Sequence, residues 1–576
     1  MGMMQQITTQ ALITPALLAL LTIAHEDVSM DMDSGMGTGT HAAPTTSPSG
    51  YSKPKTIQCD TPMSYFACGG HYGIIIGHIS LMILGWVLIL PSSVMLSIAR
   101  SRFAPLSHLL FLVVNALGLV LGALYNTQTP DLYENNAHHK IGWIVTWIII
   151  CKFILVLILF YTGHLDSKPV FNSLEYTSFM PVASDENRRS CESGQGAGID
   201  ASLDSPTSPP FEPHGLFDET DHSEKYARSF GMRDWFHSSV MNRCLSRYVP
   251  RIVSSRASYI SDTANNIIDR IVLPLGFLTI ASGAVTYGGI FRGKDAFNGL
   301  AHFIKGGIFF WYGIITLGRF VGTWADLGWA WNLKPTASVV GWKARVPSAE
   351  FVESFVIFLY GLTNVFLEHL SNWGGAWAPS DLEHVSISIM FFGGGLIGML
   401  FESHRIRHAL NNTLRQTTPY DPYNEKWQPP KSQGVSLNPM PALIILLLGT
   451  MMESHHQDSM TSTMVHKQWG NMLVGFALAR GMTYVLLFLR PPVSYLPARP
   501  PTEIVSSFCL IAGGLLLMLS TRNVVEAMEY YRLDAMFTFT IGMGFTAFIM
   551  CLVILNIVLK AWAVRTPEAL ASNDRS

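Results

Sequence analysis

Residues 69–100 read GGHYGIIIGHISLMILGWVLILPSSVMLSIAR, and this stretch decides the fold class. It contains no Asp, Glu, Lys or Arg before Arg100. A continuous apolar run of about 20 residues is long enough for an α-helix to cross the hydrocarbon core of a bilayer. We therefore predict a transmembrane helix here, with the lipid bilayer as its surroundings.

The same pattern recurs along the rest of the chain. Of the 576 residues, 49% are hydrophobic and only 14% are charged, against roughly a quarter in an ordinary soluble domain. The formal net charge of −2 gives no reason to expect nucleic acid as a partner. The predicted fold class is all-α, a polytopic integral membrane protein. Its spanning segments number about eleven and lie near residues 71–97, 106–125, 138–162, 271–291, 300–320, 350–370, 382–402, 438–456, 464–488, 503–521 and 535–560.

The N-terminus has the features of a secretory signal peptide. Ala11–Ala24 is an apolar run that is too short to span a membrane, and small residues precede a cleavage site after Ala24. We expect residues 1–24 to be removed and residues 25–68 to form a lumenal or extracellular segment. Cys59 and Cys68 both fall in that segment, so we expect a disulfide between them; the alternative is two unpaired thiols.

Charge at the helix ends predicts the orientation, because Lys and Arg favour the cytosolic side of a membrane. Basic residues cluster at the connections that the segment order places inside: ARSR at 99–102, KAR at 343–345, HRIRH at 404–408, the loop from Arg490 and the tail from Lys560. The N-terminus is therefore expected to be lumenal or extracellular, and the tail, residues 563–576, to be cytosolic. The signal peptide predicts the secretory or endomembrane system, or the plasma membrane, as the location.

One connection, residues 164–270, is far longer than the others and is predicted to be cytosolic. From Asp185 to Glu224 it holds ten acidic and two basic residues, a composition typical of disorder. From Lys225 to Arg256 it holds seven basic residues and one acidic residue, as in a helix on anionic lipid or a basic segment with no specific ligand. The loop separates a three-helix domain, residues 69–163, from a domain of about eight helices, residues 271–562.

The positions of the histidines suggest where chemistry takes place. Ionisable side chains inside a membrane are costly and tend to mark ion, proton or cofactor sites. His78 on the first helix and His139 on the third lie toward the same side, and a b-type haem between helices needs one histidine from each of two helices. His71 and Gly85 share the helix face of His78, and Gly85 leaves room for a flat macrocycle. The alternative is that these histidines only hydrogen-bond between helices.

These helices resemble the membrane core of the cytochrome b-561 superfamily. The resemblance is carried by GHISLMILGWVLILPSSVMLSIAR at 77–100, PLSHLLF at 105–111 and HHKIGW at 138–143. It implies haem b bound by histidine pairs, with His108 as a ligand of a second haem. The fourth histidine of the superfamily is absent from the next helix, and His302 lies one helix later and comes from the other side. This departure puts the second haem in question.

A second group of ligand-type residues lies at the outer ends of the later helices. Carboxylate and imidazole together are a ligand set for zinc or copper. The residues predicted to converge on a metal site are Glu368, His369, Glu383, His384, Glu453, His455, His456 and His466. The alternative is that these side chains simply face water at the helix ends.

The segment that follows the signal peptide is a third candidate site. It reads HEDVSMDMDSGMGTGTH at 25–41. Thioether and imidazole ligands suit copper, so the predicted ligands are His25, Met30, Met32, Met36 and His41. The alternative is a flexible polar spacer.

The chain as a whole is similar to the fungal Ytp-one-like family of membrane proteins. The residues that carry this resemblance include GLAHFIKGGIFFWYG at 299–313, LEHVSISIMFFGGGLIGMLFESHRIR at 382–407 and HKQWGNMLVGFALARGMTYVLLFLRP at 466–491. The resemblance implies an N-terminal b-561-like domain followed by a larger multi-helix domain. It implies no biochemical activity, because the family has none firmly assigned.

Three functional hypotheses follow from these residues. The first is a transmembrane electron carrier with a b-type haem, the second is a protein that binds or transports copper or zinc, and the third is a non-catalytic membrane scaffold. The sequence contains no Walker A loop, GxSxG or HExxH. The sequence therefore assigns no catalytic residue, and it leaves protein partners unknown.

Overall fold

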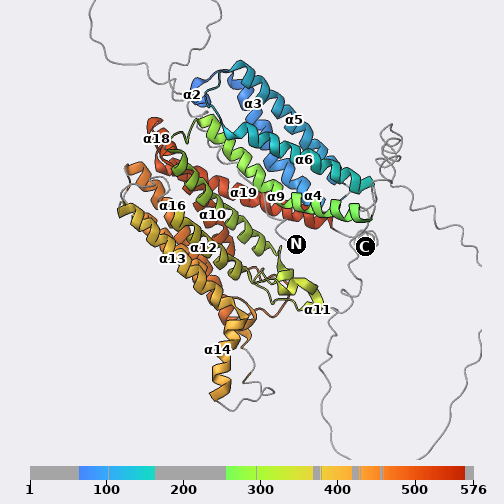
Figure 1. Ribbon diagram of the computed structural model, residues 1–576, viewed down its shortest axis with the longest axis vertical. Helices are drawn as coiled ribbons and strands as arrows, with labels where there is room; N and C mark the ends of the chain where they lie inside the picture. Colours follow the sequence, from blue (N-terminus) through green and yellow to red (C-terminus); the bar gives the residue numbers. More distant parts are fainter. Residues whose placement is uncertain are drawn as a thin grey trace, which may run out of the picture. The chain divides into compact units, whose positions relative to one another are not determined.

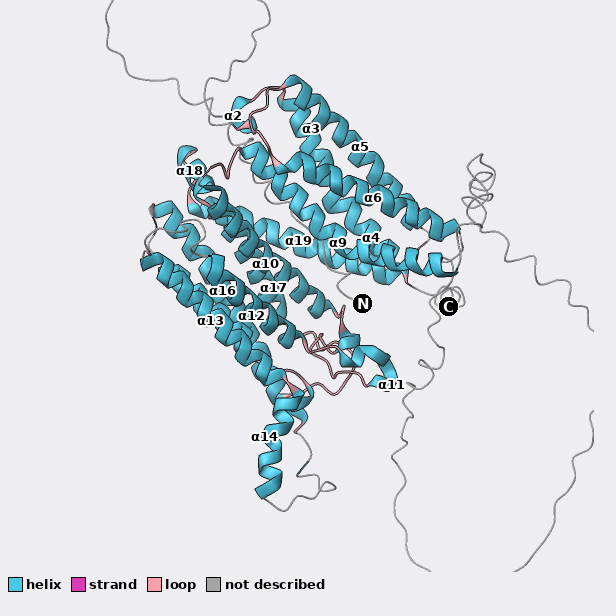
Figure 2. Cartoon of the chain, viewed as in Figure 1, coloured by secondary structure: helices cyan, strands magenta, loops and turns pink. Residues whose placement is uncertain are grey.

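The structure is a computed structural model, and the residues that it describes form helices joined by loops and turns, with no strand among them (Figure 2). Those residues are 64–101, 103–161, 255–293, 295–367, 377, 379–417, 427, 430–454, 457 and 459–564. The chain divides into two units, one formed by residues 1–166 and 261–576 and the other by residues 167–260. The predicted signal peptide, the Met/His segment and most of the long loop lie outside the described residues.

The first group of helices comes before residue 290 (Figure 1). Its elements are α2 Tyr65–Cys68, α3 Tyr72–Ile83, a π-helical segment Leu84–Ile89, α4 Leu90–Ile98, α5 Ala104–Gln128, α6 Ala137–Tyr161 and α9 Ser255–Gly288.

The second group runs from residue 295 onward. Its elements are α10 Asp295–Val321, α11 Ala337–Val340, α12 Ala349–Leu367, α13 Pro379–Glu402, α14 His404–Thr417, α15 Met440–Ser454, α16 Met460–Leu489, α17 Thr502–Leu519, α18 Arg522–Tyr530 and α19 Ala535–Ala563. Short 3-10 turns at 325–327, 341–345 and 431–434 complete it.

The prediction of an all-α membrane protein is confirmed. Ten helices in the described part of the chain are long and apolar enough to cross a membrane. The predicted segment 438–456 corresponds to α15, which has 15 residues and is shorter than the others. A helix of that length rises only about 22 Å, less than the thickness of a typical hydrocarbon core.

The N-terminal group is built around one apolar core. Trp86, Phe111, Ile149 and Val272 are all buried in it and come from the π-helical segment, α5, α6 and α9. The Trp86 indole donates a hydrogen bond of 3.0 Å to Asn115 Oδ1 on α5, which satisfies its buried N–H. α9, whose spanning part begins the predicted domain 271–562, packs in this core and also contacts α10, where Phe277 stacks on Phe310 with ring centres 5.6 Å apart.

The C-terminal group is held together by close helix contacts at glycines. A Cβ atom added to Gly306 on α10 would lie 2.6 Å from the carbonyl oxygen of Gly514 on α17, and the reverse distance is also 2.6 Å. Gly449 on α15 and Gly470 on α16 approach each other in the same way, at 2.8 Å. Small residues at such crossings let helix backbones pack closely in a membrane.

The helix ends fall on two sides, which we name after the short helices they carry. On the α18 side, Tyr133 Oη donates to the Ile290 carbonyl at 2.9 Å, joining the α5–α6 and α9–α10 connections. On the α11 side, the Leu333 amide donates to the Ser494 carbonyl at 2.9 Å, joining two later connections. The sequence predicts that the α18 side is lumenal or extracellular and the α11 side cytosolic.

Candidate functional site

Two histidines of the N-terminal group face each other toward the α18 side. His78 on α3 and His138 on α6 have ring centres 6.5 Å apart, with their planes at 80°. The His78 ring donates from Nδ1 to the Gly118 carbonyl at 2.7 Å. Nδ1 of His138 lies 3.1 Å from Ser282 Oγ, and that hydroxyl donates to the Thr279 carbonyl, so Oγ accepts from the ring.

Both rings therefore use Nδ1 as the protonated nitrogen. A carbonyl oxygen has no proton to give, which fixes the tautomer of His78. In a neutral ring Nε2 is then unprotonated, the form that binds a metal ion. The hydrogen bonds to Gly118 and Ser282 both engage Nδ1 rather than Nε2.

Glycines on the neighbouring helices make space for these rings. A Cβ atom at Gly122 on α5 would lie 2.8 Å from Nδ1 of His78, and one at Gly283 on α9 would lie 3.0 Å from Cε1 of His138. Contacts under 3.0 Å are essentially never seen for real Cβ atoms. Any larger residue at Gly122 would thus displace the His78 ring.

The structure corrects the predicted pairing of His78 with His139. His139 is exposed, and its ring lies 6.5 Å from that of Trp143 on the same helix. Consecutive residues in a helix point about 100° apart, so only one of the two can face the helix bundle. His71, at the start of α3, is exposed. A Cβ atom added to Gly85 would lie 3.5 Å from the Phe111 ring, which covers the space expected for a macrocycle.

His108 has no histidine partner in the described part of the chain. It is fully buried on α5, its Nδ1 donates to the Ala104 carbonyl at 2.8 Å, and its Nε2 has no hydrogen-bond partner there. The charge of Lys152 acts on it, and Lys152 forms a buried ion pair with Asp269. Asp269 also accepts from Ser97 at 2.9 Å. A lysine and an aspartate thus occupy the region where a second haem would need a histidine.

His302 belongs to a different pair from the one the sequence suggested. Its ring centre lies 6.2 Å from that of His466 on α16. Nδ1 of His302 donates to the Asn298 carbonyl at 2.9 Å, and Nδ1 of His466 to the Ser462 carbonyl at 2.8 Å. His384 on α13 is near enough to act electrostatically on His302. This second pair repeats the geometry of the first on the α18 side of the C-terminal group.

Much of the predicted metal rim lies outside the described residues, namely Glu368, His369, His455 and His456, as do His25, Met30, Met32, Met36 and His41. Glu453 is described and pairs with Lys467 at 3.2 Å. Among the described residues no three His, Cys, Asp or Glu side chains come together as a metal-binding group. Cys68 is disulfide-bonded, and its predicted partner, Cys59, is outside the described residues.

A buried charged cluster was missed by the sequence reasoning. It consists of Arg319, Glu350, Glu353, Arg480 and Glu503, which we call the Arg–Glu cluster; its side chains are at most 11% exposed. The sequence does contain a signal for this cluster, because charged residues interrupt apolar segments. Examples are Arg319 in ITLGRFVG at 315–322 and Arg480 in FALARGMT at 476–483. Charged residues inside a membrane span are candidate functional groups by default.

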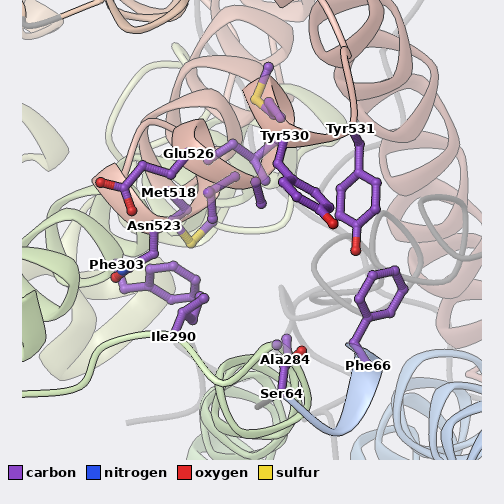
Figure 3. Close-up of a pocket in the computed structure, with 15 residues that line it drawn as sticks. Ser64, Phe66, Ala284, Ile290, Phe303, Met518, Asn523, Glu526, Tyr530 and Tyr531 are labelled. Carbon is purple, nitrogen blue, oxygen red and sulfur yellow. The ribbon is translucent and has the colours of Figure 1, made fainter. Parts of the chain in front are cut away.

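A cavity of about 340 Å³ opens on the α18 side, between α2, α9 and α18 (Figure 3). The rings of Phe66, Tyr530 and Tyr531 lie on one side of it, and Phe303 and Met518 on the other. The ring centres of Phe66 and Tyr531 are 5.8 Å apart. Burial raises the pKa of the Tyr531 hydroxyl, so this group is a neutral donor at physiological pH.

Comparison with known proteins gives the family. The model described as Protein YTP1-like, C-terminal matches residues 275–561, and Domain of unknown function (DUF2427) matches residues 60–162. An uncharacterized membrane protein of Schizosaccharomyces pombe is 32% identical over 505 residues, covering 85% of this chain and 94% of that protein. The chain belongs to the YTP1-like family.

Two relatives of this family from Saccharomyces cerevisiae match shorter parts. One, an uncharacterized membrane protein, is 38% identical over 328 residues, which is 54% of this chain and 50% of that protein. Protein YTP1 is 25% identical over 270 residues, 45% of this chain and 48% of that protein. No solved structure matches the chain. The predicted family is confirmed, and the chain is an integral membrane protein of it.

Proposed function

We propose that this member of the YTP1-like family is a transmembrane electron carrier that binds one b-type haem through His78 and His138. The observation that carries the proposal is the opposition of their two rings, 6.5 Å apart, on α3 and α6. Two imidazoles that bind one metal ion on opposite sides, at about 2 Å per bond, have ring centres about 6 Å apart. The perpendicular ring planes would allow both residues to hold a haem iron, since each plane need only contain its own bond to the metal.

The residues around the pair support the same assignment. The Gly118 carbonyl and the Ser282 hydroxyl hold Nδ1 of His78 and His138, which leaves Nε2 of each ring for the iron. Outer hydrogen bonds of this kind fix ring orientation and raise ligand basicity. When bound, the haem supplies one-electron transfer. The role of the polypeptide is to hold the two imidazoles in place and to surround the site with apolar helices.

The proposal specifies one haem rather than two. His108 lies beside the buried pair of Lys152 and Asp269, and His302 pairs with His466 instead. A second bis-histidine site on the α11 side of the N-terminal group would need a histidine on α9, and Ser255–Gly288 contains none. The resemblance to the b-561 superfamily is thus proposed for the α18-side haem alone.

The test is a reduced-minus-oxidised absorbance spectrum of the purified full-length protein. The wild type should show a b-type Soret difference, and His78→Ala and His138→Ala should each abolish it. His139→Ala is the matched control, one residue along the same helix, and should keep the signal. A signal lost in His139→Ala and kept in His138→Ala contradicts the ligand assignment, and a wild type without haem contradicts the function.

A second candidate function, transition-metal binding, is favoured by the His302–His466 pair. Its ring separation of 6.2 Å and its two carbonyl-bound Nδ1 atoms again leave Nε2 as the ligand nitrogen. We propose that these two residues hold copper or zinc. Elemental analysis should find stoichiometric metal that is lost in His302→Ala and kept in His408→Ala, an exposed histidine on α14. A non-catalytic scaffold would show neither haem nor stoichiometric metal.

A further inference from the structure

The Arg–Glu cluster occupies the α11 side of the C-terminal helices, away from both histidine pairs. Its members come from four helices: α10, α12, α16 and α17. Three of them, Arg319, Arg480 and Glu503, are at most 2% exposed. The cluster therefore lies inside the protein rather than at a solvated helix end.

Arg319 is fully engaged. It donates to Glu350 and to Glu353 at 2.6 Å each, and its Nε donates to the Trp329 carbonyl at 2.7 Å. Its guanidinium also stacks over the Trp331 ring at 4.2 Å. Such charge-assisted bonds are the strong ones in a protein interior.

Arg480 is held less tightly. It lies 3.3 Å from Glu353 and 2.8 Å from Glu503, and it reaches Thr316 Oγ1 at 3.3 Å. The contact with Glu503 is not aligned as a hydrogen bond, and neither carboxylate oxygen of Glu503 has a hydrogen-bond partner among the described residues. Within the described part of the chain, the buried Glu503 carboxylate is thus held by its ion pair with Arg480 and by no aligned hydrogen bond.

The charges of the cluster do not balance. Three carboxylates face two guanidinium groups, which leaves one negative charge in excess if all three are ionised. An uncompensated buried charge costs several kcal/mol, and proteins avoid this cost by taking up or losing a proton. Arginine does not lose its proton in proteins, so the balance must come from a carboxyl group.

We propose that the Arg–Glu cluster is a proton-binding site that holds one proton on its carboxylates at neutral pH. Glu353 is the principal carrier. Arg319 pairs with Glu350 at 2.6 Å and Arg480 pairs with Glu503 at 2.8 Å, so Glu353, which contacts both arginines, is the carboxylate in excess. This site uses no residue of the proposed haem and metal sites, so its test stands apart from theirs.

The groups around the cluster leave its balance unchanged. Tyr312 on α10 is half-buried and Tyr484 on α16 is buried; both are neutral phenols, and Tyr312 Oη accepts from Arg480 at 3.4 Å. On α19, Lys560 interacts with Asp326 and Lys343, outside the cluster. Arg407 on α14 donates to the Glu402 backbone carbonyl at 3.3 Å.

A route for the proton leads to the α11 side. Glu402, at the end of α13, is half-buried and accepts from Ser348 at 2.6 Å and Ser436 at 2.7 Å. Its charge acts on Glu350, so the two carboxyl groups are neighbours. Glu402 is therefore the half-buried carboxyl group next to the cluster, and we propose it as the entry point for the proton.

Infrared spectroscopy of the purified full-length protein tests this proposal. The wild type should show the C=O band of a protonated buried carboxyl group at neutral pH, shifted by exchange into D₂O. Glu503→Gln should remove the band, and so should Glu353→Gln, because each amide already balances the two arginines. Glu526→Gln, which changes an exposed glutamate on α18, is the matched control and should keep it.

Two results would overturn the proposal. One is a wild type without the band at neutral pH, and the other is a band that survives in both Glu503→Gln and Glu353→Gln. A third outcome, a band that disappears when sodium is added, would assign the excess charge to a metal cation instead. The first of these results uses the wild type alone, so the proposal can be overturned even if a variant fails to fold.

Discussion

The two helix groups share a plan but differ in their buried charge. Each places a histidine pair toward the α18 side, His78 with His138 and His302 with His466. Toward the α11 side the N-terminal group buries one cation with one anion, Lys152 with Asp269, whereas the C-terminal group buries the unequal Arg–Glu cluster. Removing one charge of a balanced pair leaves the other buried and uncompensated. An unbalanced cluster can lose the charge of one carboxylate and become neutral.

The largest expected effect tests that difference with the same chemical change in each group. Asp269→Asn leaves Lys152 buried and unpaired, and it should reduce the free energy of unfolding by about 3–5 kcal/mol. Glu353→Gln removes only the excess charge and should cost less than about 1 kcal/mol. Denaturant unfolding in detergent measures both, and equal losses in the two variants would contradict the distinction.

A smaller effect is expected at the ring contacts of the first histidine pair. Gly122→Ala brings a methyl group against the His78 ring, which must shift from its position opposite His138. Displaced ligand geometry should weaken haem binding by roughly 10–100-fold. Gly142→Ala, on the helix of His138 with nothing within 4 Å of the added atom, is the control and should bind haem as the wild type does. Haem titration compares them, and equal affinity would refute the role of Gly122.

The smallest effect concerns a charge pair at the surface of the α11 side. Lys343 contacts Asp326 at 2.6 Å, but both side chains are more than a third exposed. Water and salt screen such a pair, so Lys343→Met should change the free energy of unfolding by about 0–1 kcal/mol. A loss comparable to that of Asp269→Asn would show that burial does not determine how much each ion pair contributes to the free energy of unfolding.

The fold class was predictable because each spanning segment carries its own signal. Residues 69–100 alone indicate a membrane helix, and the same apolar length recurs in every segment but α15. The grouping of helices was less predictable. α9 packs with α3, α5 and α6 although a long loop separates it from them in the sequence.

The site was predicted in part. His78 was identified, but the choice between His138 and His139 depends on the rotation of α6 relative to α3 and α9, which hydropathy does not report. His302 and His466 meet only through the packing of α10 and α16, so their pairing has no local signal. The Arg–Glu cluster had a signal, yet only the structure shows that residues on four helices meet and that their charges are unequal.

Haem content of the purified wild-type protein tests the central claim most directly. A haemochrome assay calibrated against protein concentration should give one b-type haem per chain, bound by His78 and His138. A protein without haem would contradict the proposed function. Two haems per chain would contradict the argument that Lys152 and Asp269 occupy the region where a second pair of ligands would have to lie.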